Sequence, residues 1–137
     1  MKRSGFMVRK TRLRPRAATE RREKDPRYVS WLHEGIPCLA CLRLGETNKW
    51  PIEACHIKIA DGPSSMLGKR VADRWCIPLC SWHHRYARDC LDVNQRRWFD
   101  RMKVDPRAFC SALYDAYLTK KDGAAVVRRY ALTHASE

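Results

Sequence analysis

The sequence predicts an α+β fold, with two strands and an intervening loop at its centre and helices on either side. The chain has 137 residues, which is short for two domains of about 100 to 200 residues each. Its middle alternates between polar and apolar residues as strands do, and its second half has apolar residues at helical spacing. We therefore expect a single domain over residues 25–120, between a flexible basic arm (1–24) and a C-terminal tail (121–137).

The first elements are predicted by a helix cap and by alternation. Asp25-Pro26 places a capping carboxylate before a proline at the first helical position, which predicts a helix over 26–34 that Gly35 ends. A tight turn over 37–42 follows. Residues 49–60 resemble a strand, because Ile52, Ala54 and His56 alternate onto one face.

The following segments alternate between loop, strand and helix. Residues 61–70 form a Gly/Ser/Pro-containing loop, whose glycine spacing and final Arg70 do not fit a nucleotide-binding P-loop. A second strand is expected over 75–79 and a helix over 81–89. Two amphipathic helices follow over 93–102 and 106–118, with aromatic stripes that we assign to the core, and the chain is expected to fray from Gly123.

The charge of the chain favours a polyanionic partner. Lys and Arg number 28 against 15 Asp and Glu, a net charge of +13, and residues 1–30 alone carry +8. Such an excess is typical of proteins that bind nucleic acid, although a solubilising tail is the alternative. No apolar run follows the basic start and none is long enough for a membrane helix, so we expect a cytoplasmic protein with no membrane partner.

Cysteine spacing predicts a structural zinc site. Seven cysteines in a protein expected to be cytoplasmic favour metal binding over disulfides. Cys38-x-x-Cys41 and Cys80-x-x-His83 each supply two ligands from one turn, as a tetrahedral zinc site requires. Cys76 lies four strand residues, about 13 Å, from Cys80, too far to share one ion, so we interpret it as a buried thiol.

The adjacent histidines indicate a second site. On a helix the side chains of His83 and His84 diverge by about 100°. If His83 binds zinc, His84 points elsewhere, and we expect it to face the preceding strands within reach of His56.

These motifs resemble a known enzyme family. Cys-x-x-Cys, then Glu-Ala-Cys-His-Ile at 53–57, a loop, and Asp-x-Trp-x-Ile-Pro-Leu-Cys-x-x-His-His at 73–84 resemble the HNH endonucleases of the ββα-metal superfamily. Within that superfamily they are most similar to small phage-type nucleases related to the Ref recombination-enhancing nuclease. The resemblance spans 26–118, with its motif core at 37–85, and implies a zinc-stabilised, treble-clef-like ββα-metal core.

The resemblance also implies roles for individual residues. It implies that Cys38, Cys41, Cys80 and His83 bind structural zinc, that His56 is the general base, and that His84 binds a catalytic divalent ion (Mg²⁺, Mn²⁺ or Zn²⁺). Asp73 lies where the family usually has Asn, and it either orients the loop around His56 or binds the ion. Hydrolysis of a phosphodiester needs both a base for the attacking water and a cation for the phosphate charge. The basic residues expected to contact DNA are Arg9, Lys10, Arg12, Arg14, Arg16, Lys69, Arg70 and Arg85.

Two positions depart from the family pattern. Many members have Asp before the base histidine, where this chain has Cys55, a soft ligand unsuited to Mg²⁺. Glu53 or Asp73 could replace that ligand. Another histidine often follows the His-His pair, where this chain has Arg88 and Asp89.

The sequence thus predicts a DNA endonuclease of low sequence specificity, with a place in phage recombination or DNA processing and no nucleotide cofactor. One alternative is a non-catalytic zinc-dependent module that binds nucleic acid, which Cys55 favours. A second is an interaction protein whose zinc serves folding alone.

Overall fold

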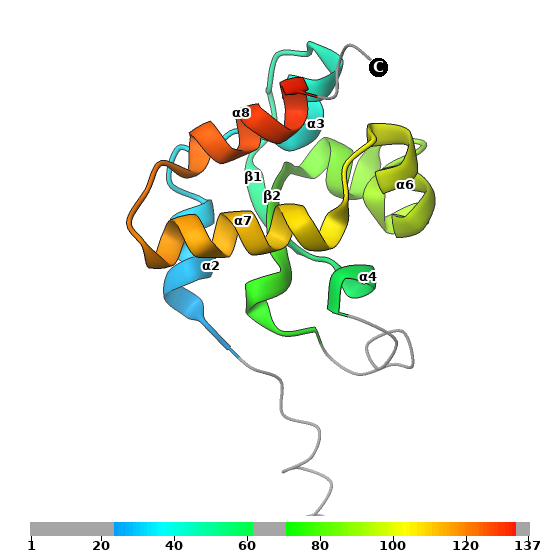
Figure 1. Cartoon of the computed structure of the whole chain (residues 1–137). Coiled ribbons are helices and arrows are strands. Elements are labelled where there is room, and N and C mark those ends of the chain that lie inside the picture. The colour runs from blue at the N-terminus through cyan, green and yellow to red at the C-terminus, as the bar shows by residue number, and fades with distance from the viewer. Residues whose placement is uncertain (1–23, 62–70, 134–137) are drawn as a thin grey trace, which may run out of the picture.

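The structure is a computed structural model that describes residues 24–61 and 71–133 (Figure 1). At its centre is a two-stranded antiparallel sheet of β1 (Ile52–His56) and β2 (Cys76–Cys80). Ile52 pairs with Cys80 at one end of the ladder and His56 with Cys76 at the other. Helices surround this hairpin, so the predicted α+β class is confirmed.

Helices at the N-terminal side of the hairpin begin at side-chain caps. In α2 (Pro26–Leu32), the Asp25 carboxylate accepts a hydrogen bond from the Tyr28 amide, as the Asp-Pro pair predicts. The segment predicted as a turn holds a short helix, α3 (Leu39–Leu44), which ends at Gly45 with φ of 71°. Gly45 is suited to this left-handed position because it has no Cβ.

The first predicted strand is shorter in the structure, and the second is shifted by one residue, because helical turns lie next to both. The segment after β1 forms α4 (Lys58–Asp61), and a 3₁₀ turn, η2 (Asp73–Trp75), precedes β2. After β2 the expected helix is one π-helical turn, η3 (Trp82–Tyr86), and a second 3₁₀ turn, η4 (Leu91–Val93), follows. Sequence alternation therefore located both strands but overestimated the first.

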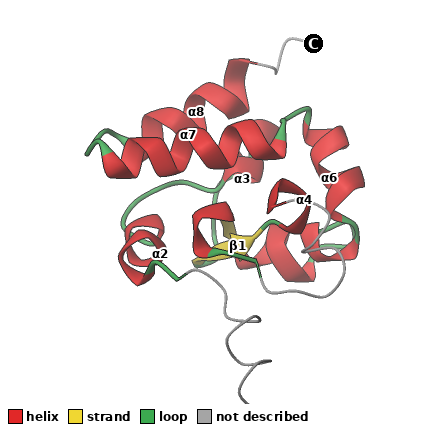
Figure 2. Ribbon diagram, turned by 60° about the horizontal axis from the view of Figure 1, so that its bottom comes forward, coloured by secondary structure: helices red, strands yellow, loops and turns green. Residues whose placement is uncertain are grey.

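The last three helices are α6 (Gln95–Met102), α7 (Pro106–Leu118) and α8 (Gly123–Thr133). Of these, α7 contacts β2, α8 packs against α3 and α7, and α6 packs against α4 and η4. Helices α7 and α8 lie side by side as one layer over the hairpin (Figures 1 and 2). The aromatic stripes predicted for α6 and α7 lie in the core, and the largest fully buried side chains include Trp98, Tyr28, Phe99, Phe109, Leu113 and Val127. None of the described helices has the length and apolarity needed to cross a membrane.

The C-terminal segment differs from the frayed tail that was predicted. Val127 and Ala131 of α8 are fully buried. At Gly123 a Cβ atom would lie 2.5 Å from Trp31 Cη2 and 2.7 Å from Ile36 Cδ1, so only glycine allows this approach. This helix is held by packing against residues that are distant in sequence. Composition does not record such contacts, so the segment was predicted to be a tail. The predicted arm, apart from Lys24, lies outside the described residues, as do the loop at 62–70 and residues 134–137.

Candidate functional site

Two tight turns bring the predicted zinc ligands together. Cys38 caps α3, and its Sγ accepts a hydrogen bond from the Cys41 amide at 3.4 Å. Cys80 is the last residue of β2, and His83 lies one turn later in η3. All four residues are buried, and one ligand atom from each lies within 4.8 Å of the others.

The separations within this Cys/His quartet match a tetrahedral ion. His83 Nδ1 lies 3.3 Å from Cys80 Sγ, 3.6 Å from Cys41 Sγ and 3.9 Å from Cys38 Sγ. Cys41 Sγ and Cys80 Sγ are 3.8 Å apart. Tetrahedral zinc, with Zn–S of about 2.3 Å and Zn–N of about 2.0 Å, separates two sulfurs by about 3.8 Å and sulfur from nitrogen by about 3.5 Å. The quartet could therefore hold a structural metal such as zinc.

The Nε2 atom of His83 contacts a residue that the sequence did not predict, Glu46. Nε2 lies 3.1 Å from Glu46 Oε1, just after α3. A carboxylate at this place keeps the proton on Nε2 and leaves the Nδ1 lone pair for a metal. No spacing rule identifies Glu46, because it reaches His83 only after the chain has folded.

Burial makes the metal-free thiols poor acids. It raises the pKa of Cys38 to about 11 and raises the pKa of Cys41 further above its ordinary value. Since a metal binds the thiolate, these protons must leave when an ion enters, and metal affinity will rise with pH.

The remaining central cysteines, Cys55 and Cys76, are buried. Cys76 is fully buried in β2, as predicted. Cys55 is also fully buried, and burial raises its pKa well above the ordinary value. Its thiol lies 3.6 Å from the Glu53 carbonyl oxygen, to which it donates. Cys55 is therefore a neutral thiol, not the replacement for an aspartate ligand.

His56 is paired with the predicted Asp73. Its Nε2 lies 2.8 Å from Asp73 Oδ1, and the side chains are 32% and 7% exposed. The second oxygen of Asp73 accepts a hydrogen bond from the Asp25 amide at 2.8 Å, and Tyr114 donates to the Asp25 carboxylate at 2.7 Å. The cap of α2 and the face of α7 thus position Asp73, and Asp73 positions His56. A third donor, Cys76, lies within 4.8 Å of both.

His84 lies in a different set of contacts. Its Nδ1 is 2.7 Å from Glu53 Oε1, and its Nε2 is 3.4 Å from Asp92 Oδ1. Arg85 also contacts Glu53, with Nη2 at 2.6 Å from Oε2. Burial raises the pKa of Glu53, but hydrogen bonds from His84 and Arg85 outweigh burial and leave it below the ordinary value. Glu53 is therefore an anion beside His84.

Strand alternation separates the two histidines. Glu53 and His56 are three residues apart in β1, so their side chains leave opposite faces of the ladder. His84, held by Glu53, does not meet His56 as the sequence predicted. In the described part of the chain, no group of three donors within 4.8 Å joins His84 to Asp73.

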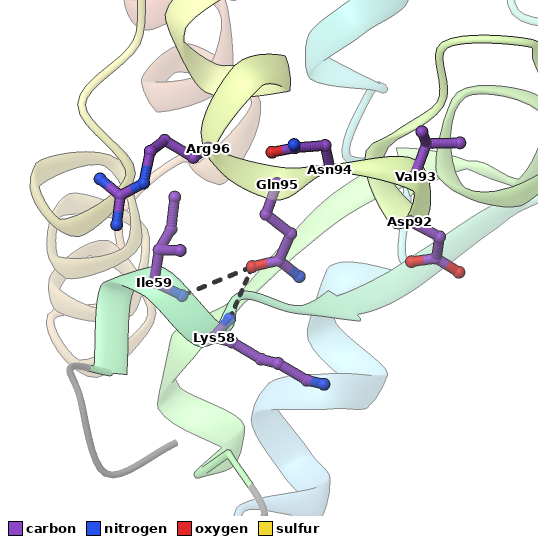
Figure 3. Close-up of a pocket in the computed structure, with 7 residues that line it drawn as sticks. All are labelled: Lys58, Ile59, Asp92, Val93, Asn94, Gln95 and Arg96. Atoms are coloured by element: carbon purple, nitrogen blue, oxygen red, sulfur yellow. Dashed lines mark hydrogen bonds between the residues drawn. The ribbon is translucent and has the colours of Figure 1, made fainter. Parts of the chain in front are cut away.

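A pocket of about 660 Å³ is lined by Asp92, which contacts His84, and by Gln95, which contacts the His56 backbone, although neither histidine lines it (Figure 3). Gln95 reaches from the start of α6 and accepts hydrogen bonds from the Lys58 and Ile59 amides, while its Nε2 donates to the His56 carbonyl oxygen. Asp92 and Arg96 lie on either side of Gln95. Gln95 was not predicted, since a lone polar residue at a helix start carries no sequence signal.

The predicted DNA-contacting residues fall mostly outside the described chain. Only Arg85 is described, and its guanidinium is bound to Glu53. Arg9, Lys10, Arg12, Arg14, Arg16, Lys69 and Arg70 belong to the segments that are not described.

Comparisons with known proteins found no relative. The chain matches no protein-family model, no curated protein and no solved structure.

Proposed function

We propose that the protein is a metal-dependent DNA endonuclease of the HNH type. The observation that carries this proposal is the pairing of half-exposed His56 with the buried carboxylate of Asp73, 2.8 Å away. The pair lies where β1 ends, and the Cys/His quartet joins α3 to the end of β2 and to η3. Two strands followed by a helical turn, in this order, are what a ββα-metal nuclease would have. In this proposal the quartet binds zinc, and the zinc holds η3 against α3.

His56 has the surroundings of a general base. A buried carboxylate that accepts the Nε2 proton fixes one tautomer, so Nδ1 of the neutral ring is the nitrogen that takes up a proton. Asp73 also stabilises the imidazolium that results, because its charge lies 2.8 Å away. Of the two roles left open for Asp73, its hydrogen bonds favour orientation of His56.

His84 and Glu53 are the residues that would hold the catalytic cation. They supply one nitrogen and a carboxylate that is anionic at neutral pH. Mg²⁺ and Mn²⁺ are commonly bound by one or two protein carboxylates, with water and phosphate oxygens as the other ligands. Such an ion supplies charge neutralisation to the phosphate. Asp92 contacts the other nitrogen of His84, so it orients the imidazole.

Positive groups around the pocket support a phosphate-bearing substrate. Lys58 and Arg96 both line it, and Lys58 follows the base by two residues. The net charge of +13 adds a long-range attraction for DNA. Contacts to phosphate carry no sequence information, which is consistent with low specificity. A role in phage recombination is part of this proposal and rests on the sequence resemblance.

The test is cleavage of plasmid and single-stranded DNA by zinc-loaded protein with added Mg²⁺, Mn²⁺ or Ni²⁺. We expect metal-dependent cutting that His56→Ala abolishes while zinc content and DNA binding persist. The matched control is His33→Ala, because His33 is exposed and its ring hydrogen-bonds to the Val29 carbonyl oxygen in the preceding turn of α2. Equal cutting by wild type and His56→Ala would contradict the proposal.

A non-catalytic zinc module that binds nucleic acid is the second candidate. The observation that favours it is the Arg85 salt bridge, which already neutralises Glu53 on the face away from His56. Salt-sensitive DNA binding with no cleavage under any added metal would select this candidate.

A further inference from the structure

Three aromatic rings gather on the surface beside the Cys/His quartet. Trp50, Trp82 and Tyr86 are 45%, 40% and 58% exposed. The rings of Trp50 and Trp82 are stacked, with centroids 5.5 Å apart and planes at 23°, and Tyr86 lies 6.0 Å from Trp50. We call these three residues the aromatic platform.

The platform is built by the fold and not by chance exposure. Trp50 precedes β1, whereas Trp82 and Tyr86 are the first and last residues of η3. A hydrogen bond of 2.9 Å from the Ser81 amide to the Pro51 carbonyl oxygen joins these two segments beside the rings. Two residues of the Cys/His quartet, Cys80 and His83, lie on either side of Ser81 and Trp82 in the same segment.

Aromatic exposure is confined to this place in the described chain. The other large exposed apolar residues are aliphatic: Leu44, Val93, Leu118 and Leu132. The other aromatic side chains of the described residues are buried or pack against the core, among them Trp75, Trp98, Phe99 and Phe109. Folding has thus left two tryptophans and a tyrosine in water at one spot, which is costly unless a ligand covers them.

The surroundings of the platform favour a negatively charged occupant. Lys49 lines a pocket of about 380 Å³ together with Trp50 and Trp82. Arg85 lies beside Tyr86, with its guanidinium carbon 5.2 Å from the ring centroid, but its charge is paired with Glu53, so Lys49 is the cation that this argument uses. The one acidic residue of this pocket, Glu46, is engaged with His83. Flat rings with a lysine at their edge match a strand whose bases stack and whose phosphates carry charge.

We propose that the aromatic platform binds single-stranded DNA by stacking unpaired bases on Trp50 and Trp82. This inference deepens the proposed function and rests on DNA being the substrate, since it assigns the protein a preference for unpaired segments. Base pairing would bury the faces that the platform needs, so a perfect duplex should gain little from it.

The test compares short oligothymidylate with a blunt duplex of the same length, measured by fluorescence anisotropy. The protein is the full chain carrying His56→Ala, loaded with zinc and without other added divalent ions, so that cleavage does not interfere. We expect Trp50→Ala with Trp82→Ala to weaken single-strand binding about tenfold or more, and duplex binding less than about twofold. Leu118→Ala is the control, because Leu118 is 59% exposed and lies away from the platform. Equal losses for both DNAs, or none, would overturn the proposal.

A second measurement needs no substitution at the platform. Trp50 and Trp82 are more exposed than Trp75 and Trp98, so acrylamide quenches them first. Saturating oligothymidylate should protect the quenchable fraction, and duplex should not. An unprotected fraction at saturation, or protection by oligouridylate alone, would overturn the assignment to single-stranded DNA. DNA cleavage by the wild-type protein is measured separately. Platform-dependent binding without cleavage would contradict the proposed nuclease activity but would support the proposed binding of single-stranded DNA.

Discussion

Asp73 Oδ1 lies 2.8 Å from His56 Nε2, across 17 residues of chain, where β1 ends and η2 leads into β2. The other oxygen of Asp73 is tied to the Asp25 amide at the start of α2. A buried carboxylate with two such partners cannot rotate away from the imidazole. The position of His56 therefore depends on three elements of the fold.

Asp73→Asn tests this positioning. Asparagine can present its NH₂ group to Nε2 and select the wrong imidazole tautomer, so DNA cleavage should fall about a hundredfold or more. The free energy of unfolding should fall by about 1–3 kcal/mol, because the buried hydrogen bonds are weakened. Asp89→Asn is the control: Asp89 is an exposed residue, 3.6 Å from Arg101, and surface pairs contribute little. Unchanged cleavage by Asp73→Asn would show that Asp73 does not orient the base.

Zinc binding should depend on the four residues of the Cys/His quartet and not on the number of cysteines in the chain. Zinc-loaded protein should hold about one ion per chain, and Cys41→Ser should lose it and unfold at a much lower temperature. Cys90→Ala should keep the ion, since Cys90 is buried but belongs to no metal-binding donor group among the described residues. Elemental analysis and thermal unfolding measure both. A zinc-free wild type that folds normally would refute the site.

Glu46→Gln should lower the affinity for zinc without abolishing zinc binding. Glu46 holds the outer nitrogen of His83 at 3.1 Å, but its side chain is 52% exposed. We expect zinc affinity to fall by about tenfold, the lower end for such carboxylates, because water screens the contact. Competition with a chromogenic chelator gives the affinity, and Glu34→Gln, another exposed acid, is the control. Equal affinities for the two variants would leave Glu46 without a role.

The contacts of Glu53 predict a pH-dependent term in stability. Its pKa is lower in the folded protein than in the unfolded chain, so it binds fewer protons when folded. Its stabilisation is therefore complete above the ordinary value of about 4.5 and is lost as the pH falls through the folded value. Without added divalent ions, Glu53→Gln should destabilise the protein at neutral pH, and this difference should shrink as the pH falls below the ordinary value of about 4.5 and through the lower folded value. Urea unfolding at several pH values measures it, and a constant difference would contradict the assignment.

Gly123→Ala should show that α8 belongs to the domain. The new methyl group would meet Trp31 and Ile36, so we expect a loss of about 1–3 kcal/mol in the free energy of unfolding. Ala125→Ser, at an exposed position of the same helix, is the control. Chemical denaturation measures both variants. If they were equally stable, α8 would not pack as described.

The sequence by itself determined the features that depend on neighbouring residues. Cys-x-x-Cys and Cys-x-x-His each place two ligands in one turn, whatever the position of that turn in the fold. The quartet could therefore be predicted from the sequence. The Asp105-Pro106 cap and the spacing of Phe109 and Leu113 likewise determined α7, because capping and helical periodicity act within a few residues.

Tertiary structure decided which groups meet across the hairpin and where α8 lies. His84 was expected beside His56, but alternation in β1 puts its partner, Glu53, on the opposite face. Val126, Val127, Tyr130 and Ala131 have helical spacing in α8, and the basic residues between them obscured this pattern. Contacts between residues that are tens of positions apart depend on how the whole chain packs. A local pattern in one sequence does not contain that information.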